Sequence, residues 1–138
     1  MEQQNPHIEV IWGPATLEML TAFCKEYLDP LDDNALSLSV QLVVEEIVVN
    51  AMQHGYGDEA GSVKVSLDIE PGTITLTIRD STPEFNPLLF VPDDTDPGEG
   101  GRGLSLVRQL AETTLYERTS EGENILRCIF PRSTDRLK

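Results

Sequence analysis

The chain has 138 residues, of which 39% are hydrophobic and 25% are charged, so it can form one folded domain and is not a disordered chain. Acidic residues outnumber basic ones by 24 to 10, which gives a formal net charge of −14 at pH 7. A surface this negative repels nucleic-acid phosphates and anionic lipids, which argues against direct nucleic-acid or membrane binding and suits a basic protein partner, although solubility alone would also explain it.

The first part of the chain predicts a strand and two helices. Residues 8–12 are short, apolar and β-rich, which is typical of a strand. Apolar residues at helical spacing then predict a helix that ends at about Leu28, before a helix-breaking Asp-Pro pair. Asp32, Asp33 and Asn34 offer N-caps for a longer helix that reaches about His54. Its apolar positions cover most of its surface, so we expect it to be largely buried.

The middle of the chain predicts an antiparallel hairpin. Residues 63–69 and 73–79 both alternate apolar and polar side chains, and Pro71 and Gly72 lie between them. Proline and glycine in succession favour a tight turn, because proline presets one backbone angle and glycine tolerates the next. The alternation indicates a sheet with one buried face.

The last part of the chain predicts a long loop, a helix and two strands. Residues 81–101 contain four prolines and several acids, so we expect no regular structure there. Residues 102–112 return to a helical pattern, and residues 115–116 and 125–130 predict two closing strands. Residues 133–138 are expected to form a loose tail, and residues 1–138 a single domain.

Cysteine usage and the N-terminal sequence indicate the compartment. Cys24 and Cys128 each lie among apolar residues and lack CxxC spacing, so we expect two buried free thiols and neither a disulfide framework nor a zinc site. The N-terminus lacks a signal-peptide pattern, and no apolar run is long enough to span a bilayer. We therefore expect a cytoplasmic protein.

Three polar residues interrupt the apolar surface of the second predicted helix. Glu46, Asn50 and His54 are four residues apart, so they lie on one helix face. Buried polar groups cost free energy unless something pairs with them. In a binding site, Asn50 would offer an oxygen to Mg²⁺ and Glu46 would take a proton. The alternative is a partly exposed helix edge on which Glu46 is simply solvated.

Two further motifs follow along the chain. Asp80 ends the second strand of the hairpin, where its carboxylate either accepts a hydrogen bond from the amino group of a base or simply starts a turn. A glycine-rich segment, residues 98–104, precedes the last helix, and it either cradles phosphates at a helix N-terminus or acts as a hinge. It matches neither the dinucleotide-binding pattern nor the P-loop pattern.

Together and in this order, the three motifs resemble the histidine-kinase-like (GHKL) ATPase superfamily. Within it the chain is similar to the stand-alone anti-sigma factor serine/threonine kinases, over nearly its whole length. The resemblance implies that Glu46 is the catalytic base, that Asn50 is the Mg²⁺ ligand and that Asp80 reads adenine. It also implies nucleotide contacts, listed here in chain order: Asn50, His54, Asp80, Thr82, Gly98, Gly100, Gly101, Arg102, Gly103 and Leu104.

The resemblance implies an α+β fold, a two-layer α/β sandwich of the Bergerat type. This fold has a mixed, mostly antiparallel sheet with helices on one face, and a lid at about residues 86–101. The expected cofactors are ATP and Mg²⁺. The expected partners are a sigma factor and a small anti-sigma antagonist whose serine or threonine is phosphorylated, and a homodimer stays open. Sibling families carry a helical hairpin or a transducer domain, neither of which we expect here.

One residue departs from the family pattern. The first glycine box normally reads Asp-x-Gly, but here Thr82 occupies the position of the glycine. A β-branched residue disfavours positive φ and would crowd the nucleotide or tilt the loop, so the expectation is either weaker ATP binding or a slightly reshaped pocket. Two alternatives to the kinase follow: a nucleotide-dependent binding module without kinase activity, and a structural domain in which the three motifs coincide by chance.

Overall fold

The computed structural model describes residues 5–51, 61–82, 107 and 109–132. Within these ranges the chain forms five strands and two long helices joined by one 3₁₀ turn. The elements are, in chain order, β1 (His7–Ile11), α1 (Thr16–Leu28), η1 (Asp29–Leu31), α2 (Asn34–Ala51), β2 (Ser62–Ile69), β3 (Thr73–Asp80), β4 (Thr113–Arg118) and β5 (Asn124–Pro131).

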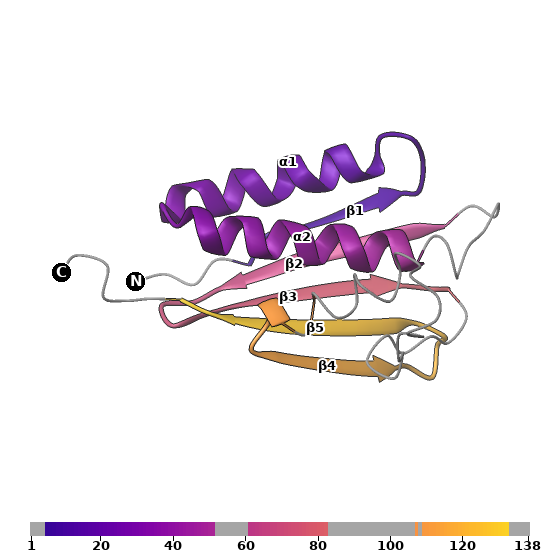
Figure 1. The fold of residues 1–138 in the computed structure, drawn as a ribbon. Helices are drawn as coiled ribbons and strands as arrows, with labels where there is room; N and C mark the ends of the chain where they lie inside the picture. The colour runs from indigo at the N-terminus through magenta and orange to yellow at the C-terminus, as the bar shows by residue number, and fades with distance from the viewer. Residues whose placement is uncertain (1–4, 52–60, 83–106, 108, 133–138) are drawn as a thin grey trace, which may run out of the picture.

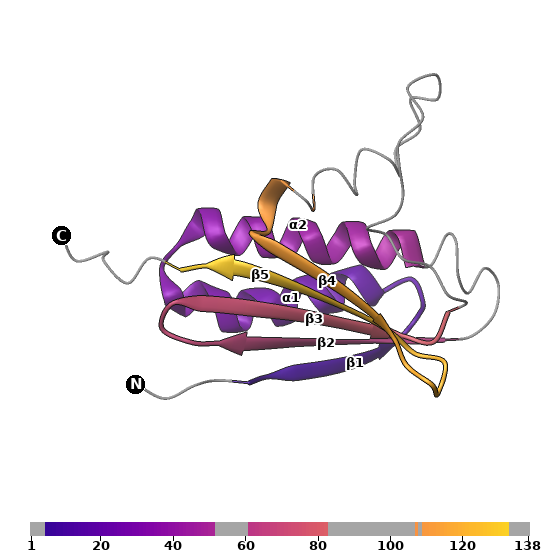
Figure 2. The same ribbon diagram turned by 90° about the horizontal axis from the view of Figure 1, so that it is seen from below.

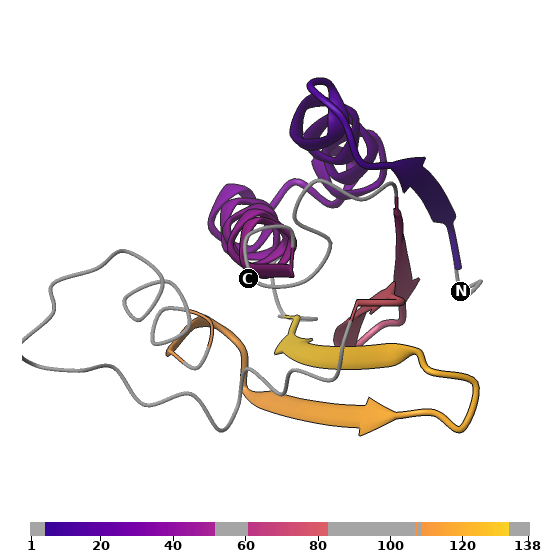
Figure 3. The ribbon, with the colours of Figure 1, turned by 90° about the vertical axis from the view of Figure 1, so that its right-hand side faces the viewer.

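The strands form one sheet in the order β1-β2-β3-β5-β4, and each of the four strand pairs is antiparallel. Helices α1 and α2 lie together on one face of this sheet (Figures 1 and 2). Figure 3, seen from one end of the molecule, shows the sheet curving around the two helices. The predicted α+β fold with helices on one sheet face is therefore confirmed.

The core lies between the helices and the inner face of the sheet. Alternate residues of β2 and β3 supply that face, as the predicted hairpin requires, and they are fully or almost fully buried: Val63, Val65, Leu67, Ile69, Ile74, Leu76 and Ile78. Each such side chain contributes about 1.5–3 kcal/mol by leaving water. Their polar neighbours point to the opposite face, so the two faces of the hairpin differ as the sequence predicts.

The start of α2 follows from the acidic residues before it. Asp32 takes a left-handed conformation with φ of 57°, which turns the chain after η1. Asp33 then caps the helix, because its Oδ1 accepts the backbone N–H of Leu36 at 3.1 Å. Of the three N-cap candidates in the sequence, Asp33 provides this bond.

Several boundaries differ from the expectations. β1 begins one residue earlier than predicted and ends at Ile11, because the hydroxyl of Thr16 accepts the Gly13 N–H at 2.7 Å and so turns the chain into α1. β4 runs from Thr113 to Arg118, longer than the predicted pair of residues, because its whole length pairs with β5. The predicted lid at 86–101 and the tail at 133–138 lie outside the described residues.

The expectations for the cysteines are confirmed, since Cys24 and Cys128 are free and fully buried. In the part of the chain that the structure describes, no helix is long and apolar enough to cross a membrane.

Candidate functional site

The C-terminal half of α2 carries the first two predicted site residues. Asn50 is only 4% exposed, and it lies among the buried apolar residues of the helix. Its side-chain nitrogen donates a hydrogen bond of 2.7 Å to the backbone carbonyl of Glu46. This bond occupies the nitrogen end of the amide, so the oxygen end is the one that can accept a donor or ligate a cation.

Glu46 lies one helical turn before Asn50 and is half-buried, whereas its neighbour Glu45 is exposed. The alternative of a solvated helix edge therefore does not hold for Asn50, which is buried. Glu46 is only half-buried, so for this residue the alternative of a solvated carboxylate stays open. Two groups of different chemistry, a carboxylate and an oriented amide, thus lie on one face of α2.

Asp80 is the last residue of β3, and its side chain is on the inner face of the sheet because it follows the alternation of Ile74, Leu76 and Ile78. Its Oδ1 accepts hydrogen bonds from the backbone N–H of Thr82 at 3.0 Å, from the Thr82 hydroxyl, and from the side-chain nitrogen of Asn124 at 3.0 Å. No donor among the described residues reaches Oδ2. The carboxylate is therefore anchored through one oxygen.

Asn124 connects Asp80 to β4. The register of β3 and β5 places Asn124 directly opposite Asp80. Its side-chain oxygen accepts the hydroxyl of Tyr116 and the guanidinium of Arg118, the latter at 3.1 Å. The same guanidinium nitrogen donates to the backbone carbonyl of Thr82 at 2.8 Å. Four residues from three strands, together with Thr82 two residues after β3, therefore form one hydrogen-bonded network.

Thr82 does not produce the backbone strain that its position in the glycine box suggests. Among the described residues other than glycine, Asp32 alone has a positive φ, so Thr82 is not in the left-handed region. Its side chain is 2% exposed and is directed into the network with Asp80 and Asn124. The position therefore does not need the positive φ that glycine tolerates, and the effect of Thr82 on nucleotide binding stays a prediction.

The fold brings the two halves of the candidate site to one end of the molecule. The C-terminal end of α2, with Asn50, and the C-terminal end of β3, with Asp80, lie at the same end in both views of the sheet (Figures 1 and 2). The other predicted contacts lie outside the described residues, namely His54, Gly98, Gly100, Gly101, Arg102, Gly103 and Leu104.

Three residues of the network had no role in the sequence-based prediction: Tyr116, Arg118 and Asn124. The segments that hold them resemble the family, but that similarity does not say what they contact. Only the register of β5 against β3, across 44 residues, puts Asn124 beside Asp80. A buried polar residue at the start of a mostly apolar strand was the available signal.

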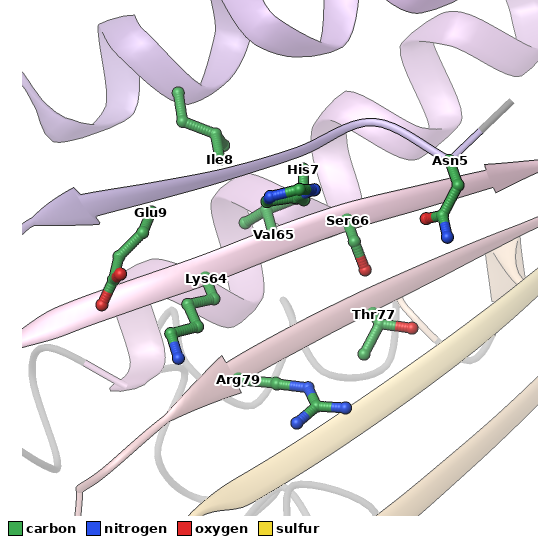
Figure 4. Close-up of a pocket in the computed structure, with 9 residues that line it drawn as sticks. All are labelled: Asn5, His7, Ile8, Glu9, Lys64, Val65, Ser66, Thr77 and Arg79. Carbon is green, nitrogen blue, oxygen red and sulfur yellow. The ribbon is translucent and has the colours of Figure 1, made fainter.

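A separate cavity of about 400 Å³ lies on the open face of the sheet, opposite the helices (Figure 4). It is lined by side chains of β1, β2 and β3, among them His7, Lys64 and Arg79. None of the predicted site residues lines it. Arg79 is already paired there with Glu123 at 3.3 Å, so the cavity offers little unbalanced charge.

The described residues fit the ligands that the motifs imply. The amide oxygen of Asn50 suits Mg²⁺ that takes its remaining ligands from phosphates and water. A carboxylate anchored through one oxygen suits a base with an amino group, because the second oxygen can accept it. Among the described residues there is no cluster of three or more His, Cys, Asp and Glu side chains, so a metal cage made by protein alone is not present there.

Comparison with known proteins shows the family of the chain. The family described as a histidine kinase-like ATPase domain matches residues 14–130. An anti-sigma F factor of Anoxybacillus flavithermus (strain DSM 21510 / WK1) is 33% identical over 108 residues, which cover 71% of this chain and 70% of the relative. Anti-sigma F factors of Geobacillus stearothermophilus and Geobacillus kaustophilus (strain HTA426) are each 44% identical over 54 residues, about a third of their length.

Proposed function

Because the chain belongs to the histidine kinase-like ATPase family and groups there with anti-sigma F factors, we propose that it is an ATP-binding anti-sigma regulator with serine/threonine kinase activity. The observation that carries the proposal is the buried side chain of Asn50. Its amide nitrogen is bound to the carbonyl of Glu46, so its oxygen is the end of the amide that remains for a ligand.

Each site residue has one role in this proposal. Asp80 accepts the amino group of adenine, and the oxygen of Asn50 holds Mg²⁺. When bound, Mg²⁺ would neutralise the charge of the ATP phosphates. His54 and the glycine-rich residues 98–104 complete the nucleotide contacts by their match to the family motifs.

Glu46 acts on the protein substrate. Its half-buried carboxylate accepts the proton of a serine or threonine hydroxyl as that oxygen attacks the γ-phosphorus of ATP. The bond from this phosphorus to the β–γ bridging oxygen breaks, and ADP leaves. Phosphoryl transfer depends mainly on alignment and charge neutralisation, so a single positioned base is enough on the protein side. The acceptor is a small antagonist protein.

The second partner is a sigma factor, which the regulator sequesters. The net charge of −14 supports a partner with a basic surface, because complementary charge speeds association and selects partners. This part of the proposal includes a cytoplasmic location and one nucleotide-binding domain per chain, with a homodimer as the assembly. Sedimentation at several protein concentrations, with and without ATP, tests the homodimer.

Calorimetry of ATP binding, with and without Mg²⁺, tests the nucleotide site. Wild type should bind ATP more tightly with Mg²⁺, Asn50→Ala should lose that difference, and Asp80→Asn should weaken binding in both conditions. Asp68→Asn is the matched control, because Asp68 is a half-buried aspartate on the adjacent strand β2 and lies outside the network. A wild-type protein that binds no ATP would overturn the proposed function.

Phosphate transfer to a candidate antagonist tests the kinase step. Glu46→Gln should abolish transfer and leave ATP binding intact, since the amide cannot take a proton. Glu45→Gln removes the same charge from the exposed neighbouring position and should transfer phosphate normally. Equal transfer by both variants would exclude Glu46 as the base and would leave a nucleotide-dependent binding module.

A further inference from the structure

We propose that Thr82 and Asn124 are positioning residues for base recognition: they hold Asp80 through Oδ1 so that Oδ2 faces the amino group of adenine. The inference rests on the proposed function, in which Asp80 binds the base. It adds to that function a means of selecting adenine. The side chain that orients Asp80 comes from Thr82, the position at which the family pattern has glycine.

The bonding of Asp80 supports this division between its two oxygens. Oδ1 receives three donors, two from Thr82 and one from Asn124, whereas no described residue donates to Oδ2. Rotation of the carboxylate would break all three bonds at once. Hydrogen bonds to a charged acceptor are stronger than neutral ones, so a single orientation dominates before the ligand binds.

The side chain of Asn124 is itself fixed. Its oxygen accepts Tyr116 and Arg118, which are both donors, so the nitrogen must be the end that faces Asp80. That nitrogen also lies 2.9 Å from the Thr82 hydroxyl oxygen. The hydroxyl therefore accepts from Asn124 while it donates to Asp80, and the three side chains form a closed ring of bonds.

Burial strengthens the hydrogen bonds of this ring. Asn124 is 5% exposed and Thr82 is 2% exposed, so water competes little for their hydrogen bonds. An acceptor that is already oriented loses less freedom when it binds a ligand, and that raises affinity. A carboxylate oxygen can only accept, so the fixed Oδ2 favours the 6-amino group of adenine and disfavours the 6-carbonyl group of hypoxanthine.

The test compares ATP with ITP, which differ at that single group, by calorimetry on purified full-length chain. Wild type should prefer ATP. Thr82→Val keeps the shape but removes the hydroxyl, and it should weaken ATP binding about tenfold while ITP binding stays the same or improves. Thr82→Gly should behave likewise. Thr82→Ser keeps the hydroxyl and should restore the preference.

Controls separate positioning from general damage. Thr75→Val removes a hydroxyl from β3 outside the network, and it should leave the preference for ATP over ITP unchanged. Tyr116→Phe removes one support of Asn124 and should reduce the preference less than Thr82→Val does. Thermal unfolding without nucleotide should show that Thr82→Val and Asn124→Ala are coupled, because the two side chains share bonds.

The outcomes for the two proposals are distinct. If wild type binds ATP and Asp80→Asn does not, but Thr82→Val and Thr82→Gly keep the wild-type preference, the positioning role is wrong and the proposed function stands. Tighter ATP binding by Thr82→Gly would show that Thr82 only obstructs the base. If wild type binds no nucleotide, both proposals fail.

Discussion

Alkaline pH should destabilise this protein through its two buried thiols. Burial raises the pKa of Cys24 on α1 and of Cys128 on β5 from 9.0 to about 12 in each case. Between these values the unfolded chain loses protons that the native chain keeps, so the free energy of unfolding falls as the pH rises. The contribution of the thiols is complete below pH 9 and disappears toward pH 12.

The size of this effect follows from the shift. Where the unfolded chain has lost the proton of a thiol and the native chain has kept it, the free energy of unfolding falls by about 1.4 kcal/mol per pH unit for that thiol. At pH 10.5 the two thiols together should therefore lower the free energy of unfolding by about 4 kcal/mol relative to pH 8. This is a large part of the 5–15 kcal/mol, roughly, that stabilises a domain of this size.

Urea unfolding of the reduced protein at pH 8 and pH 10.5 measures this loss. The Cys24→Ala/Cys128→Ala double variant provides the comparison, because it keeps every tyrosine and lysine that also titrates in this range. We expect the wild type to lose more stability than the double variant by about the 4 kcal/mol worked out above. Equal losses in the two proteins would refute the reasoning, since the thiols would then ionise alike in both states.

Four other predictions concern the N-cap of α2, the core, an exposed position on β4 and the metal. Asp33→Ala should lower the free energy of unfolding by about 1 kcal/mol in thermal unfolding, because Leu36 loses its N-cap acceptor. Leu76→Ala should cost about 2–5 kcal/mol in urea because the side chain is fully buried. Leu115→Ala, on the exposed side of β4, should stay within about 0.5 kcal/mol. Chelation by EDTA should weaken ATP binding in wild type and leave Asn50→Ala unchanged in calorimetry, because the variant lacks the proposed ligand oxygen.

The periodicity of apolar residues predicted those helices and strands whose form depends on one stretch of sequence. The alternation in β2 and β3 and the apolar spacing in α2 come from burial of one face, which a sequence records directly. The four-residue spacing of Glu46 and Asn50 likewise placed both residues on one face of α2. It did not give their bond, because the side-chain nitrogen of Asn50 competes for a carbonyl of its own helix.

The network around Asp80 was not predictable from local patterns. It depends on the register between β3 and β5, and a shift by one residue would turn Asn124 to the other face of the sheet. The hydrogen bonds of Thr82 were not predictable for a related reason. The glycine in the family pattern suggested a special backbone angle, whereas the structure has an ordinary backbone there and a hydroxyl bound to a partner on another strand.

The pairing of β3 with β5 also affects how the protein matures on the ribosome. Asp80 is synthesised 44 residues before Asn124, and their bond cannot form until the later strand has been made. The ribosomal exit tunnel delays that moment further, because it covers the most recently added residues. The bond between Asp80 and Asn124 can therefore form only after β5 has left the tunnel and docked beside β3.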